Sequence, residues 1–73
     1  MSERLPTVTA KVMVRVLLRL GFEDIRKKGS HRIFGKGNRR VIVPMHSGDL
    51  KPGTLKAILD AAGLSAADLR DLL

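Results

Sequence analysis

The chain has no cysteine, tryptophan or tyrosine, and only two phenylalanines among its 73 residues. The absence of cysteine excludes a disulfide framework and any thiolate metal site, and it is typical of proteins from a reducing compartment. Two phenylalanines cannot supply the stacking platforms on which single-strand binders hold successive bases. Recognition of nucleic acid would therefore depend on backbone phosphates, on duplex shape, or on a few unstacked nucleotides held by cations.

Long hydrophobic runs are also missing. The longest apolar stretch, residues 12–20, is interrupted by Arg15 and Arg19 and is shorter than the ~20 residues that a membrane span needs. The residues before it include Glu3 and form no apolar core of their own, so they lack the features of a secretory signal. We therefore expect a soluble, cytoplasmic protein with no membrane partner, folded as a single domain over residues 1–73 with a thin hydrophobic core.

Charge of one sign dominates the chain and is concentrated in its middle. Fourteen Lys and Arg residues against seven Asp and Glu residues give a net charge of +7. Residues 26–40, RKKGSHRIFGKGNRR, hold seven of the cations and no acid, whereas Asp60, Asp68 and Asp71 gather after Lys56. A merely solubilising surface would explain the net charge but not this segregation. The sequence predicts a basic patch for a polyanion, of which nucleic acid is the usual one.

The first part of the chain has the spacing of an amphipathic helix. Lys11, Arg15 and Arg19 recur at i, i+4 and i+8, which predicts a helix over residues 10–20 with Thr9 as N-cap and Gly21 as its stop. Its expected core stripe consists of Val12, Met13, Val16, Leu17 and Leu20. Val14 and Leu18 lie beside the basic row, where they are either packed by the N-terminal arm or exposed to a partner.

A second helix is predicted to begin at Pro52 and to end at Gly63. Its apolar face has the spacing i, i+3, i+4, i+7 and consists of Leu55, Ile58, Leu59 and Ala62. Ser65 and Asp68 then form a capping box that opens a last short helix with Leu69, Leu72 and Leu73.

Between the helices the sequence predicts three short strands, FEDIRK (22–27), SHRIF (30–34) and RRVIV (39–43). Lys28-Gly29 and the GKGN segment supply the tight turns, and Pro44 ends the third strand. The order α-β-β-β-α with a helical tail predicts an α+β fold, in which helices pack on one face of a three-stranded antiparallel meander.

Three segments, GFEDIRKKGSHRIF, RRVIVPMH and LKPGTLKAILDAAGLS, resemble in order and spacing the HicA toxin family, also called YcfA-like, of toxin–antitoxin pairs. The resemblance extends from the first helix nearly to the C-terminus. It implies a fold similar to a double-stranded-RNA-binding domain, the activity of an mRNA interferase, and neutralisation by a HicB antitoxin. It also implies that His31, the histidine of GSH, is catalytic. Many members carry a second histidine directly after it, where this chain has Arg32.

On the residues alone, His31 is either an ordinary strand histidine or a catalytic one. RNA cleavage by its own 2′-OH needs a base for that proton and an acid for the leaving oxygen, and histidine exchanges protons near neutral pH. Lys27, Lys28 and Arg32 could stabilise charge on the reacting phosphate. With the resemblance added, the catalytic interpretation is the one we adopt. His46, the only other imidazole, is either an ordinary loop residue or a second proton carrier in a supporting role.

RNA is expected to lie along the basic patch and the start of the second helix. The predicted RNA-binding residues are Lys27, Lys28, Gly29, Ser30, Arg32, Arg39, Arg40, Lys51 and Lys56. The backbone N–H groups of Gly53 and Thr54 form a natural phosphate seat, in addition to the helix initiation that Pro52 provides. His31, His46 and Asp49 lack metal-ligand spacing, so neither a metal nor another cofactor is predicted.

Three functions are compatible with these features. The leading hypothesis is a metal-independent endoribonuclease toxin that acts on mRNA, is monomeric when free and pairs with a HicB-like antitoxin. The second is a non-catalytic RNA-binding module that regulates translation. The third is a structural or regulatory protein whose basic face docks an acidic partner.

Overall fold

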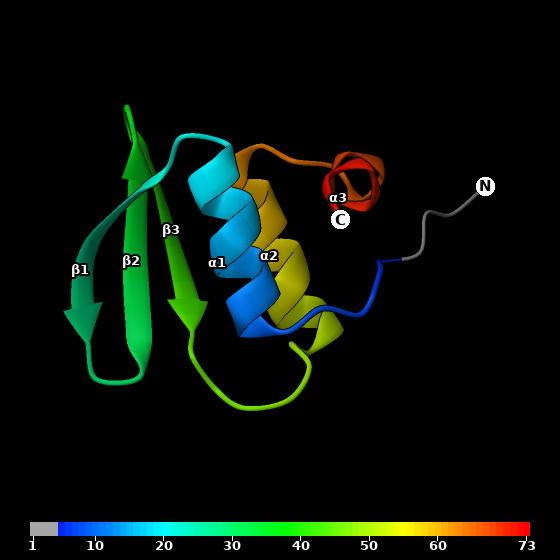
Figure 1. The fold of residues 1–73 in the computed structure, drawn as a ribbon, viewed down its shortest axis with the longest axis horizontal. Helices are drawn as coiled ribbons and strands as arrows, with labels where there is room; N and C mark the ends of the chain where they lie inside the picture. The colour runs from blue at the N-terminus through cyan, green and yellow to red at the C-terminus, as the bar shows by residue number, and fades with distance from the viewer. Residues whose placement is uncertain (1–4) are drawn as a thin grey trace.

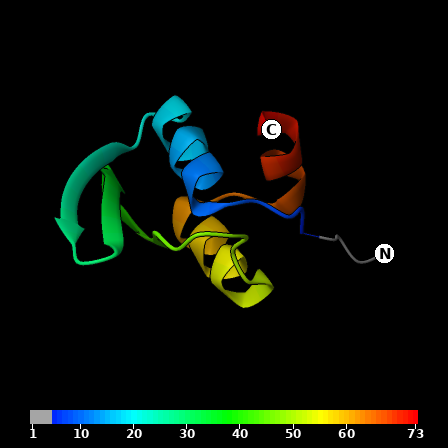
Figure 2. The same ribbon diagram turned by 60° about the horizontal axis from the view of Figure 1, so that its bottom comes forward.

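The structure is a computed structural model that describes residues 5–73. Within these residues, three helices and three strands make up the fold. The elements are α1 (Ala10–Arg19), β1 (Glu23–Lys28), β2 (His31–Lys36), β3 (Arg39–Pro44), α2 (Pro52–Ala62) and α3 (Ala66–Leu72). The strands form one antiparallel sheet in the order β1-β2-β3. Helices α1 and α2 cover one face of this sheet, and the other face is open (Figures 1 and 2). The predicted α-β-β-β-α order with a short C-terminal helix is confirmed.

Two tight turns set the register of the sheet. Lys28 pairs with His31 and Lys36 with Arg39, so each hairpin loop has only two residues. Gly29 and Gly37 stand first in these loops, with φ of +59° and +58°. Glycine at this position with positive φ is the signature of a type II′ turn, whose twist matches that of the flanking strands. The first turn lies at Gly29–Ser30, one residue later than the sequence predicts.

The core lies between the sheet and the two long helices. From the sheet it receives Phe34, Val41 and Val43, whose side chains are fully buried. The helices contribute Ala10, Met13, Val16 and Leu17 of α1, Leu55, Ile58, Leu59 and Ala62 of α2, and Leu69 of α3. The apolar face predicted for the second helix is therefore confirmed. No helix within residues 5–73 is long and apolar enough to cross a bilayer.

The predicted core stripe of the first helix is right only at its centre. Met13, Val16 and Leu17 are buried, but Val12 and Leu20 are only partly so. Helix α1 ends at Arg19, which leaves Leu20 as its C-cap, and the buried stripe begins instead at Ala10.

The side chains of Val14 and Leu18 differ in their exposure. Val14 packs at the margin of the core, whereas the side chain of Leu18 is 50% exposed. The structure thus favours exposure for Leu18 and packing for Val14.

The last helix begins with the predicted capping box. The Asp68 N–H donates to the Ser65 Oγ, and the Ser65 N–H donates to the Asp68 carboxylate, both at 3.0 Å. The hydrogen bond from the Ser65 backbone lowers the pKa of Asp68 below its ordinary value, and hydrogen bonding by the Ser65 side chain lowers it further. Leu73, expected on the apolar side of this helix, follows its end and is 57% exposed.

The capping box makes stability depend on pH in a defined direction. Because the pKa of Asp68 is lowered on folding, its carboxylate stabilises the fold above the ordinary value of 3.8, and this contribution is lost as pH falls through the lower folded value. We expect Asp68→Asn to unfold at lower urea concentration than the parent chain at neutral pH, with the gap closing in acid. Asp71→Asn, an exposed position in the same helix, is the control. If the difference in urea midpoint between Asp68→Asn and the parent chain stayed constant from pH 7 down to about pH 2, the stabilisation would not come from the Asp68 carboxylate.

Candidate active site

His31 and His46 lie on one groove, at the end of the sheet where β2 begins and β3 ends. The groove has a volume of about 510 Å³. It is lined by His31, Pro44, His46, Ser47, Gly48, Asp49, Leu50, Lys51 and Thr54. Both imidazoles are exposed, and their ring centres are 6.4 Å apart at an angle of 80°. The fold thus brings both histidines of the chain to one solvent-accessible place.

The sheet positions His31 from both sides. It is the first residue of β2, and its ladder partners are Lys28 in β1 and Pro44 in β3. The turn before it is tied to the next loop, because the Met45 N–H donates to the Ser30 carbonyl at 2.6 Å. His31 is therefore held on the middle strand of the sheet.

His46 lies in the loop that connects β3 to α2, and this loop is anchored at both ends. The Met45 bond to Ser30 fixes its beginning. At its end, the Leu50 N–H donates to the Val8 carbonyl at 2.9 Å, and Asp49 forms an isolated antiparallel bridge with Thr9. The segment before α1 therefore sets where His46 lies relative to His31.

The start of α2 adds positive charge to the groove. Lys51 is the N-cap residue and Pro52 follows it, and no described side chain caps this helix end. The backbone N–H groups of Gly53 and Thr54 belong to the first turn, where helices lack internal acceptors. Lys51 and Thr54 both line the groove. The helix dipole, these N–H groups and the Lys51 ammonium together favour an anion beside the two imidazoles.

Strand alternation separates Arg32 from His31. Phe34 faces the helices, so Arg32, two residues earlier in β2, is on that face, and His31 is on the other. The Arg32 guanidinium pairs with the Asp24 carboxylate and lies 5.9 Å from the centre of the Phe34 ring. Its Nε is buried with no hydrogen-bond partner among the described residues. The predicted RNA contact of Arg32 is thus on the far side of the strand from the catalytic candidate.

The remaining predicted RNA-binding residues fall into two groups. Lys28, Gly29 and Ser30 adjoin His31 at the first turn, with Lys27 paired across from Arg32. Arg39 and Arg40 lie at the opposite end of β3, where Arg39 donates to the Ala61 carbonyl at 3.2 Å and Arg40 to the Gly37 carbonyl at 3.0 Å.

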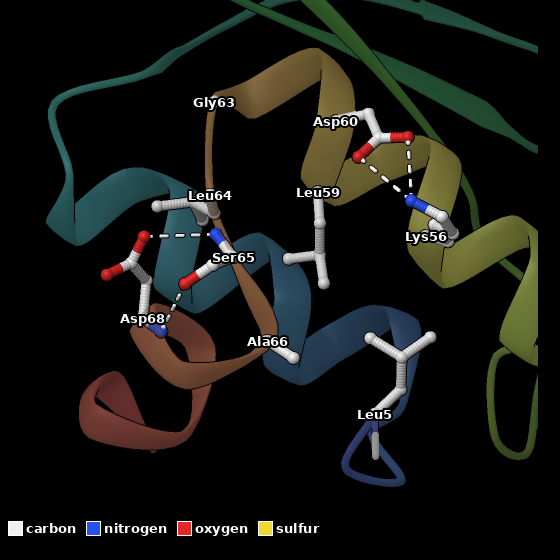
Figure 3. Close-up of a pocket in the computed structure, with 9 residues that line it drawn as sticks. All are labelled: Leu5, Lys56, Leu59, Asp60, Gly63, Leu64, Ser65, Ala66 and Asp68. Carbon is white, nitrogen blue, oxygen red and sulfur yellow. Dashed lines mark hydrogen bonds and ion pairs between the residues drawn. The ribbon is translucent and has the colours of Figure 1, made fainter. Parts of the chain in front are cut away.

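Lys56 belongs to a different hollow from the groove with the two histidines. Its ammonium is 3.3 Å from the Asp60 carboxylate, in a depression of about 670 Å³ that the groove residues do not line (Figure 3). The structure therefore brings Lys28 and Lys51 to the histidines, and it does not bring Arg39, Arg40 or Lys56 there.

Ser47 is not among the residues singled out from the sequence, and Asp49 is considered there only as a metal ligand and rejected. Both line the groove, and the signal for them was the polar HSGD segment directly after a predicted strand. Within residues 5–73, no three histidine, aspartate or glutamate side chains come close enough to hold a metal ion.

The matched family covers the groove as well as the sheet. A family model described as HicA toxin of bacterial toxin–antitoxin matches residues 10–64, from the start of α1 to just beyond α2. The matched range contains both histidines and the first turn of α2. Comparison with curated proteins finds no match. The chain belongs to the HicA toxin family of bacterial toxin–antitoxin systems.

Proposed function

We propose that this toxin is a metal-independent endoribonuclease that cleaves mRNA, with His31 as its principal acid–base residue. The observation that supports this is the pair of exposed imidazoles on one groove, beside a helix start that no described side chain caps. A module that only bound RNA would need the cations but not two proton carriers in reach of each other.

The chemistry follows from the reach of the two rings. A hydrogen bond spans about 2.7–3.2 Å, so rings whose centres are 6.4 Å apart can bond to two oxygens of one phosphodiester. One neutral imidazole takes the proton of the 2′-OH, and the freed oxygen attacks the adjacent phosphorus. The bond from phosphorus to the 5′-oxygen breaks, and the other imidazolium gives its proton to that oxygen. The products are a 2′,3′-cyclic phosphate and a 5′-hydroxyl.

The groove also supplies groups for the charge on the reacting phosphate. The N–H groups of Gly53 and Thr54 are fixed donors at the helix start. Lys51 at the N-cap adds an ammonium, and Lys28 adds a cation across the ladder from His31. Donors already in place stabilise the transition state without reorganisation. DNA has no 2′-OH, so this route is closed to it.

Proteins of this family pair with antitoxins, and we propose a HicB-like antitoxin that covers His31 and much of the basic patch at residues 26–40. A free ribonuclease acting on cellular RNA would be lethal to its own host. An antitoxin that lay over the exposed His31 would exclude RNA from the groove.

Replacement of His31 tests the catalytic assignment. We expect His31→Ala to lose RNA cleavage and growth arrest while it keeps its fold, since His31 is exposed and packs nothing in the core. Cleavage of an RNA oligonucleotide in EDTA, beside the same sequence as DNA, is the measurement. Growth arrest by a folded, well-expressed His31→Ala protein, or comparable cutting of the DNA, would refute the assignment.

Replacement of His46 tests the two-imidazole scheme. We expect His46→Ala to slow cleavage roughly 10²- to 10⁴-fold, the usual contribution of one general acid or base. It should also remove one limb of the pH–rate profile, which a purely structural role would not do. Asn38→Ala, an exposed position in the turn between β2 and β3 at the other end of β2 from His31, is the control. If His46→Ala keeps both limbs, His46 is not the second proton carrier.

The salt dependence of RNA binding tests which cations contact the RNA phosphates. Each phosphate contact with single-stranded RNA adds about −0.7 to the slope of log affinity against log salt. We expect Lys28→Ala and Lys51→Ala each to flatten the slope by about one contact. Arg15→Ala, an exposed cation on α1, is the control and should leave it unchanged. Slopes that Lys28 and Lys51 do not affect would remove both from the binding site.

A further inference from the structure

The open face of the sheet carries a strip of apolar side chains. Ile25 of β1 and Ile42 of β3 are 52% and 54% exposed, which places them among the most exposed large hydrophobic residues of the described chain. Ile33 of β2 is the ladder partner of Ile42 and is only partly covered. Helices α1 and α2 lie against the other face (Figure 2). Isoleucines from all three strands thus meet where no element within residues 5–73 covers them.

Two local features make this strip continuous. The register of β1 against β2 shifts between Asp24 and Arg26, a β-bulge in which Ile25 is the extra residue. Gly35 then leaves room on the middle strand. A Cβ there would collide with the Ile25 Cδ1 and would lie 2.8 Å from the Arg40 Nη1. Because Gly35 has no side chain, the side chains of Ile25 and Arg40 can extend over its backbone.

Cations border this strip. Arg26 is the ladder partner of Ile33, Arg40 is that of Gly35, and Lys28 is that of His31. Ladder partners share a face, so these three cations are on the open face with the isoleucines, where Glu23, the β1 partner of Gly35, adds one carboxylate against them. An exposed apolar patch with a polar rim is typical of a protein interaction site.

We propose that the open face is a docking surface for a protein whose apolar centre is surrounded by carboxylates, and that this protein is the antitoxin. This inference rests on the proposed pairing and adds the surface and its chemistry. The antitoxin would place apolar side chains on Ile25, Ile33 and Ile42, and acidic ones opposite the cations of the rim. His31 is two residues before Ile33 on the same face, so a partner seated here also lies beside the groove.

The same observations argue against RNA and against a second copy of this chain as the occupant of the open face. RNA bases are held by stacking on aromatic rings, and the strip consists of isoleucines. A second copy of this chain would bring its own cationic rim against the first, at a net charge of +7 on each. An acidic protein meets neither obstacle.

The experiment is calorimetry and association kinetics with the purified full chain and its purified cognate antitoxin. A double variant, Ile25→Thr with Ile42→Thr, keeps β-branched side chains and therefore the strands. Leu73→Thr is the control, since Leu73 is 57% exposed at the end of the chain. We expect the double variant to bind the antitoxin at least about tenfold more weakly, as the loss of buried apolar surface requires. Its RNA cleavage and the antitoxin affinity of Leu73→Thr should match the parent chain.

A second variant tests the rim independently of the isoleucines. Arg26→Glu should slow association with the antitoxin and reduce its dependence on salt. An unchanged antitoxin affinity in the double variant, together with an unchanged association rate in Arg26→Glu, would overturn the proposal. So would loss of RNA affinity alone, or loss of a dimer of this chain alone. Absence of cleavage by the parent chain would refute the ribonuclease and leave this measurement intact, because binding needs no catalysis.

Discussion

Burial of Phe34 fixes the direction of the candidate functional side chains on the sheet. Phe34 is fully buried between the sheet and the helices, on the middle strand. Because side chains alternate along a strand, its burial places Arg32 on the helix side and His31, Ile33 and Gly35 on the open side. A shift of one residue would exchange the two sets, so the two-residue turns at each end of β2 preserve the site as well as the fold.

This alternation gives the two faces different chemistry. On the helix side, Arg32 is engaged by Asp24 and by the Phe34 ring. On the open side, His31 stands at the end of an apolar strip with a cationic rim, next to the groove that holds His46 and the start of α2. The run of cations at residues 26–40 is therefore not one uniform patch. In the proposed function, RNA and an antitoxin would compete at the groove while using different neighbouring surfaces.

Features set by short sequence spacing could be predicted, and features set by contacts distant in sequence could not. The α2 face, the Ser65 capping box and the strand order follow from local periodicity and turn residues. The approach of His46 to His31 depends on the Thr9–Asp49 bridge, which joins segments far apart in the chain. The bulge at Ile25 and the Asp24–Arg32 pair depend likewise on the register of two strands. The sequence shows the number of cations in residues 26–40, but only the pleat of the sheet assigns them to faces.

In the proposed mechanism, His31 and His46 act on one phosphodiester. The most direct measurement is an NMR titration of the imidazole resonances of the full chain with an RNA oligonucleotide whose 2′-O-methyl groups prevent cleavage. We expect both imidazole resonances to shift together, with one apparent affinity. RNA binding that left both imidazole resonances in place would contradict the two-imidazole mechanism, because the phosphate would then lie elsewhere on the basic surface.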